Sequence, residues 1–285
     1  MLQVLEGFPP CSVRRGGVKA SSPFFIYHIL GWLMDILLIV LLSVGGSTVL
    51  GVLAGLAIRH IPHRLNDIVL GFAAGVMLAA AMLGLLAPAF DSPRLKGILL
   101  AVLGTLSGAA LISVLDKIVP HLHRLAGLDS EEHRANRGIG RTLLFVTAIA
   151  LHKIPEGLAT GVSFGTEELG DVLTVAGSIS LQNIPEAIVI VAPLFAIGIS
   201  SKRVVGISFA IAAVSIVSVL LGRLLVAVFS DILPFMLASA GGAMLYVISD
   251  EMIPETHSHG FEKQSTFALI AGLILVIVMQ RLIGG

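Results

Sequence analysis

The sequence predicts an all-α protein that crosses a lipid bilayer several times, and three observations indicate this class. Of its 285 residues, 56% are hydrophobic and 13% are charged, whereas soluble domains contain about 45–50% apolar and about 25% charged residues. The mean hydropathy is +0.98. Ranges 68–90 and 204–222 contain no charged residue, and each is longer than the roughly 18 residues that mark a candidate membrane span.

The chain divides into an N-terminal segment and one membrane domain. Residues 1–34 form a polar tail with an interfacial lead-in over 24–34, and residues 35–285 form the transmembrane domain. At 1.5 Å per residue, each apolar segment of this domain can cross a hydrocarbon core of about 30 Å. Eight helical spans are predicted, at 36–58, 68–90, 98–118, 142–164, 172–197, 204–229, 232–253 and 266–283.

The distribution of Lys and Arg predicts the orientation of these spans. The loops after the first, third, fifth and seventh spans, with the adjoining helix ends, carry most of the basic residues outside the tail. Because basic residues are enriched on the cytoplasmic side, these loops are expected in the cytoplasm and both termini outside it. We expect the protein in the cell membrane, which is the inner membrane if the source is bacterial.

Charge and cysteine content exclude other classes. The formal net charge is zero, so no basic surface is expected to bind nucleic acid. The expected partner is instead the lipid bilayer that surrounds the helices. Cys11 is the single cysteine. It can form neither an internal disulfide nor a thiolate metal cluster.

A short polar motif occurs twice within adjacent apolar spans. Residues 151–156 read Leu-His-Lys-Ile-Pro-Glu, and residues 181–186 read Leu-Gln-Asn-Ile-Pro-Glu. Each copy lies near the middle of its span, where a charged side chain is costly and normally functional. Two copies on adjacent antiparallel helices predict one shared site near a pseudo-two-fold axis.

The residue types in this motif indicate a metal site. His152 and Glu156 are four residues apart and so share a helix face, as do Gln182 and Glu186. Two carboxylates, an imidazole and an amide oxygen suit Zn²⁺ or a neighbouring divalent ion. The alternative, a polar cluster that only joins helices, is disfavoured because the motif is duplicated.

Each copy also contains a proline. Pro155 and Pro185 lack an N–H and crowd the carbonyl four residues earlier, so both helices are expected to kink beside the site. Small-xxx-small patterns predict close helix contacts at Gly71/Gly75, Gly104/Gly108 and Gly157/Gly161.

On these residues the sequence resembles the ZIP family of divalent-metal transporters. The family patterns match residues 152–157 and 182–186, and the likeness extends through 70–75 and 253–257. The resemblance implies eight helices in a 3+2+3 inverted-repeat arrangement, metal delivery to the cytoplasm, and a homodimer as the assembly. It implies no resident cofactor, with Zn²⁺ favoured as the cargo over Cd²⁺, Fe²⁺ or Mn²⁺.

The resemblance also assigns roles to individual residues. The metal ligands would be His152, Glu156, Gln182 and Glu186, with Met77 as a thioether ligand or, equally, a core methionine. Asp91 would stand at the entrance, unless it is a solvated loop acid. The exit side would hold Asp250, Glu251, His121, His123, His257 and His259, although a helix-end ion pair and solvated histidines are the competing interpretations.

Two positions depart from the family pattern. Lys153 stands where the family usually has Asn, and Asn183 where it often has Asp. In two-metal members these positions help to hold a second ion. An ammonium group would repel that ion and can neutralise Glu156 instead. We therefore expect a mononuclear site in which Lys153 fills the place of the second ion.

Two other functions remain open at this point. A membrane-embedded metalloenzyme could use the same ligands to activate water, but it would need an open coordination position and a separate general base. A structural or receptor protein would bind the metal without transporting it.

Overall fold

The computed structural model describes residues 23–58, 62–91, 94–125, 137–166, 168–196 and 198–283. Side chains are described within 34–58, 62–91, 94–117, 150–166, 168–195 and 198–283. Throughout these ranges every regular element is a helix, which confirms the predicted all-α class.

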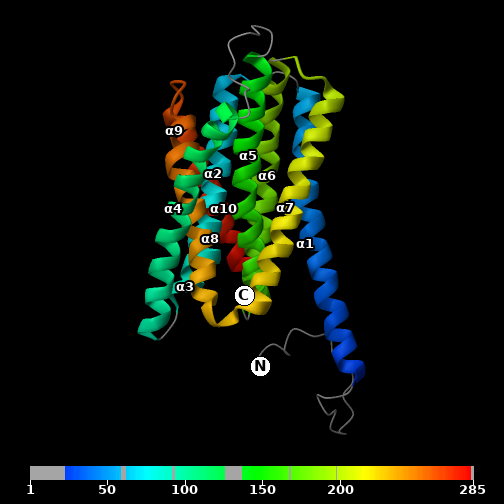
Figure 1. The fold of residues 1–285 in the computed structure, drawn as a ribbon, viewed down its shortest axis with the longest axis vertical. Helices are drawn as coiled ribbons and strands as arrows, with labels where there is room; N and C mark the ends of the chain where they lie inside the picture. Colours follow the sequence, from blue (N-terminus) through cyan, green and yellow to red (C-terminus); the bar gives the residue numbers. More distant parts are fainter. Residues whose placement is uncertain are drawn as a thin grey trace.

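The long helices lie side by side along one axis (Figure 1). In chain order the elements are α1 (Pro23–Ile58), α2 (His63–Ala79), η2 (Ala80–Leu86), α3 (Ala87–Phe90), α4 (Leu95–Leu125), α5 (Arg137–Ser163), α6 (Leu169–Ala196), α7 (Ser201–Val228), η3 (Ser230–Ile232), α8 (Leu233–Val247), η4 (Ile248–Met252), α9 (Ile253–Thr256) and α10 (Glu262–Ile283). Helix α1 is continuous through the predicted lead-in over 24–34 and the first predicted span.

Seven stretches of helix in the described part are long and apolar enough to cross a membrane. They are Met34–Ile58, His63–Phe90, Leu95–Lys117, Leu169–Phe195, Ser201–Val228, Ser230–Thr256 and Glu262–Ile283. The remaining predicted span, 142–164, coincides with α5, whose side chains are described only from residue 150 onward. The protein is therefore a multi-pass helical membrane protein, and the count of eight spans stays a prediction.

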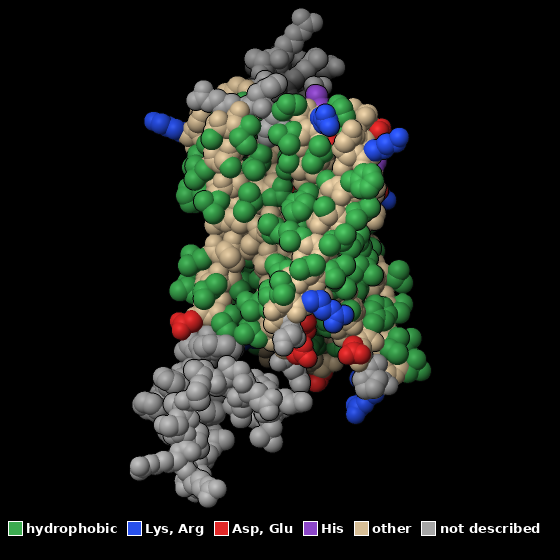
Figure 2. Space-filling model, turned by 180° about the vertical axis from the view of Figure 1, so that it is seen from behind, with side chains coloured by type: hydrophobic (Ala, Val, Ile, Leu, Met, Phe, Trp, Pro, Cys, Tyr) green, Lys and Arg blue, Asp and Glu red, His purple; other side chains and the backbone are tan. Residues whose placement is uncertain are grey.

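The outer surface of the bundle is apolar. Large side chains such as Leu106 (64% exposed), Phe209 (60%) and Phe267 (75%) point away from the core. Figure 2 shows hydrophobic side chains over the middle of one face, with Lys, Arg, Asp and Glu gathered toward its two ends. Apolar surface on this scale is stable against lipid but not against water.

Glycines set the closest helix contacts, as predicted. A Cβ at Gly75 on α2 would lie 1.9 Å from the carbonyl oxygen of Leu269 on α10. A Cβ at Gly108 on α4 would lie 1.9 Å from the carbonyl oxygen of Ser239 on α8. These helices therefore approach backbone to backbone, and the pairs α5 with α7 and α1 with α6 are packed as extensively.

Two helices widen into a π-helical turn ahead of a proline. In η2 the N–H of Ala87 bonds to the carbonyl of Met82, five residues earlier. In η4 the N–H of Ile253 bonds to the carbonyl of Ile248 in the same way. Pro88 and Pro254 follow directly, and because neither has an N–H, the regular four-residue ladder cannot continue there. The turn in η4 carries Asp250 and Glu251, two of the predicted exit residues.

Candidate metal centre

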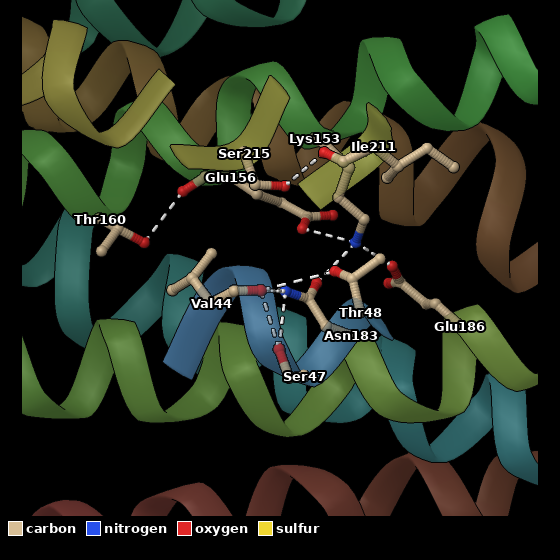
Figure 3. A network of polar contacts seen from close by, with 10 residues as sticks. All are labelled: Val44, Ser47, Thr48, Lys153, Glu156, Thr160, Asn183, Glu186, Ile211 and Ser215. Atoms are coloured by element: carbon tan, nitrogen blue, oxygen red, sulfur yellow. Dashed lines mark hydrogen bonds and ion pairs between the residues drawn. The ribbon is translucent and has the colours of Figure 1, made fainter. Parts of the chain in front are cut away.

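The ammonium group of Lys153 occupies the centre of the predicted site. Lys153 lies on α5 and is 2% exposed. Its Nζ donates to Glu156 Oε2 at 2.8 Å, to Asn183 Oδ1 at 2.6 Å and to Glu186 Oε2 at 2.5 Å (Figure 3). An ammonium group has three hydrogens, so these three acceptors use its full donor capacity.

This arrangement balances half of the buried negative charge. Glu156 is 2% exposed and the side chain of Glu186 is 15% exposed. Two carboxylates facing each other away from water would repel unless one were protonated or a cation lay between them. Lys153 supplies that cation from the protein itself. The three ionisable groups together carry a formal charge of −1.

Asn183 links this cluster to α1. Its Nδ2 donates to the carbonyl oxygen of Val44 at 3.1 Å and to Ser47 Oγ at 3.3 Å. Ser47 Oγ in turn donates to the carbonyl of Val44 at 2.9 Å. These contacts orient the amide so that its oxygen accepts from Lys153. Of the two residues that depart from the family pattern, Asn183 thus holds Lys153 in place.

His152, the neighbour of Lys153, contacts a different group. Its Nε2 lies 2.9 Å from Glu251 Oε1 in η4. With Asp116 on α4, the two residues bring one ligand atom each within 4.8 Å of one another. Among the described residues this is the group of three His, Cys, Asp or Glu side chains that could hold a metal ion. The sequence interpretation missed Asp116, although an acid near the end of an apolar span was a usable signal.

Gln182 and Met77 are completely buried. Neither the amide oxygen nor the amide nitrogen of Gln182 has a hydrogen-bond partner among the described residues. Leaving a buried polar atom unpaired costs about 1–3 kcal/mol, so such atoms usually serve a function. Met77 belongs to the same buried apolar cluster as Ala73, Ala74 and Ala81.

The predicted entrance and exit residues lie near the helix ends. Asp91 is exposed directly after α3. Asp250 is exposed and Glu251 is half-buried. Both ring nitrogens of His257 have partners, the carbonyl of Ile253 at 2.7 Å and Thr266 Oγ1 at 3.1 Å.

The other predicted exit histidines differ in how far they are described. His259 Nδ1 lies 3.1 Å from Asp67 Oδ1. His121 and His123 belong to the last turns of α4, and their side chains lie outside the described residues.

Comparisons with known proteins all give the same family. A family model described as ZIP Zinc transporter matches residues 117–280. Zinc transporter GufA of Myxococcus xanthus is 37% identical over 253 residues, which cover 87% of this chain and 98% of that protein. Zinc transporter ZIPB of Bordetella bronchiseptica is 36% identical over 244 residues, which cover 84% of this chain and 78% of that protein. Zinc transporter ZIP11 of Xenopus tropicalis is 25% identical over 296 residues, which cover 76% of this chain and 88% of that protein.

Proposed function

The chain belongs to the ZIP family of zinc transporters, and on this premise we propose that it carries Zn²⁺ into the cytoplasm past the buried polar groups of α5 and α6. The family makes it a metal-ion transporter rather than an enzyme, so the metalloenzyme alternative is set aside. The predicted membership of this family is thereby confirmed. The choice of ion, the site and the direction are the finer parts of the proposal.

One observation supports the site above all others. Four polar or charged side chains from the middle of two adjacent helices, Lys153, Glu156, Gln182 and Asn183, are at most 2% exposed. Charged groups buried in an apolar bundle are costly even when they are paired, and in membrane proteins they commonly mark an ion pathway. Glu186, beside them on α6, completes a pair of carboxylates around one point.

We assign one zinc ion to this place. The carboxylates of Glu156 and Glu186 contact Lys153 through Oε2, and we assign their Oε1 atoms to the ion. Gln182, whose amide atoms lack protein partners, supplies a neutral oxygen. Met77 is a further candidate ligand. A second dication would meet the ammonium group, so the site takes one ion.

The cluster of Asp116, His152 and Glu251 is the next position on the proposed path. His152 shares a helix face with Glu156 through the four-residue spacing and contacts Glu251 through Nε2. His152 can therefore bind the ion first at the site between α5 and α6 and then at the cluster with Asp116 and Glu251. In this proposal Asp91 marks the outer entrance and η4 the cytoplasmic exit, with both termini outside the cytoplasm.

Uptake measurements test the proposal. Purified protein in liposomes should transport Zn²⁺, and Glu156→Ala or Glu186→Ala should lower initial uptake by at least about tenfold because each removes a charged ligand. Asp231→Ala, which removes an exposed acid of η3, is the matched control and should keep normal uptake. Undiminished uptake in both site variants would refute the assignment.

A further inference from the structure

A second group of imidazole and carboxylate side chains lies beside the proposed exit and includes His259, which the resemblance assigned to the exit side. His63 begins α2, Asp67 follows one turn later, and His259 lies in the loop between α9 and α10. The rings of His63 and His259 are stacked, with centroids 4.7 Å apart and planes 24° from parallel. Asp67 is completely buried, whereas both histidines reach the surface.

The contact between Asp67 and His259 determines which ring nitrogen faces outward. His259 Nδ1 lies 3.1 Å from Asp67 Oδ1 and 3.0 Å from Ser258 Oγ. Because Ser258 Oγ donates to the carbonyl of Glu255 and an ionised carboxylate only accepts, the proton of His259 belongs on Nδ1. In a neutral ring Nε2 then carries the lone pair, with Ser258 Oγ at 3.5 Å as its nearest hydroxyl.

This is the arrangement found behind metal-binding histidines. Such histidines commonly donate one ring N–H to a carboxylate, which fixes the ring and makes the other nitrogen a better ligand. Asp67 has the required burial, and its Oδ2 has no hydrogen-bond partner within the described ranges. His63 supplies a second imidazole beside the first, and its ring nitrogens make no hydrogen bond to any described residue.

We propose that His259 and His63 form an accessory site for a divalent transition-metal ion, with Asp67 as a positioning residue and water completing the coordination. For both imidazoles to bind the same ion, the His63 ring must turn out of its stack with His259, and the exposed position of His63 leaves room for that turn. Imidazole ligands favour Zn²⁺ and its transition-metal neighbours over Mg²⁺ or Ca²⁺.

The position in the fold gives this site a role. Helix α2 contacts both η4 and α9. His63 begins α2 and His259 follows α9, so the histidine pair lies at the end of the bundle that carries α9, the upper end in Figure 1. An ion released past Glu251 would meet two surface imidazoles near the exit. The identity of the ion as Zn²⁺ rests on the proposed function, but the binding itself does not.

The test is a residue-resolved protection experiment on the full-length protein in detergent. Diethyl pyrocarbonate modifies accessible imidazoles, and mass spectrometry measures the modification of each histidine. Zn²⁺, but not Mg²⁺, should protect His63 and His259 several-fold. His257, whose two ring nitrogens already have protein partners, should show no such change and serves as the internal control.

Variants extend the same test. His63→Ala should abolish zinc protection of His259, and His259→Ala should abolish that of His63, whereas His257→Ala should change neither. Asp67→Asn should leave both histidines in place but raise the zinc concentration for half-protection by about 10–100-fold. If His259→Ala fails to fold, His259→Gln replaces it.

Two results would overturn the proposal: equal modification with and without Zn²⁺, or protection that persists at one histidine after removal of the other. The outcome is separable from that of the transport site. Glu156→Ala with Glu186→Ala should stop uptake yet preserve protection of His63 and His259. If wild-type protein transports Zn²⁺ but Zn²⁺ protects neither His63 nor His259, this inference is refuted and the proposed function is not.

Discussion

Lys153 on α5 donates a 2.5 Å hydrogen bond to Glu186 on α6, and this ion pair joins the two helices that carry the repeated motif. The same ammonium group reaches Glu156 and Asn183. The two carboxylates are thus held together before any metal ion arrives. A resident cation also lowers the charge available to the cargo, which favours one dication over two.

Replacement of Lys153 by asparagine should admit a second ion. Lys153→Asn removes the ammonium group and introduces an amide oxygen that can act as a ligand. Equilibrium dialysis should show about one more bound Zn²⁺ per chain than in the wild type. Lys202→Asn, at an exposed position of α7, is the control. An unchanged stoichiometry would show that Lys153 does not exclude a second ion.

Replacement of Lys153 by methionine should destabilise the metal-free protein. Lys153→Met leaves Glu156 and Glu186 buried without their cation, and the loss of one partner of a buried ion pair costs about 3–5 kcal/mol. Thermal unfolding in detergent should show a clear drop in the midpoint, and added Zn²⁺ should recover part of it because the ion binds the folded state. Lys202→Met should stay within about 0.5 kcal/mol. A midpoint equal to that of the wild type would contradict the structural role of Lys153.

Zinc affinity should fall in acid. A histidine ligand must be neutral to bind metal, and the imidazole of histidine in water has a pKa of about 6.5. Affinity should therefore be highest above that pH and decline as the pH drops toward 5, since protons then compete for His152. His152→Gln should bind more weakly and with a flatter pH profile. A wild-type affinity that is constant between about pH 5 and 8 would exclude His152 as a ligand.

The glycine contacts between helices should tolerate no side chain. Gly75→Ala forces a methyl group against the backbone of α10 and should cost about 1–3 kcal/mol in overpacking. Gly206→Ala on α7, where no atom lies within 4 Å of the added Cβ, is the matched control. It should be neutral or stabilising by up to about 1 kcal/mol. Equal thermal midpoints for the two variants would refute the close contact.

The sequence predicted much of this organisation because its strongest signals are local. Uncharged runs mark the membrane helices, and the repeated His-Lys-Ile-Pro-Glu and Gln-Asn-Ile-Pro-Glu segments mark the polar residues inside them. The pairing of Lys153 with Glu156 follows from a three-residue spacing on one helix. The small-xxx-small patterns predicted the helix contacts at Gly75 and Gly108.

Other features depend on contacts between distant segments, which spacing cannot predict. Nothing in the sequence places the carbonyl of Val44 beside the amide of Asn183, or Asp116 beside His152. Asp67 directly precedes the uncharged run that begins at residue 68, and that position does not indicate its complete burial. Pro254 accounts for the π-helical turn that carries Glu251. The direction in which that turn points the Glu251 side chain depends on the packing of α8, which the sequence does not give.

Determination of the zinc-bound structure, with anomalous scattering to locate the metal, tests the central claim most directly. The account predicts a single ion between α5 and α6, ligated by His152, Glu156, Gln182 and Glu186, with Lys153 Nζ still bonded to both carboxylates. Two adjacent ions in the unmutated protein, or an ion that binds away from these side chains, would contradict it.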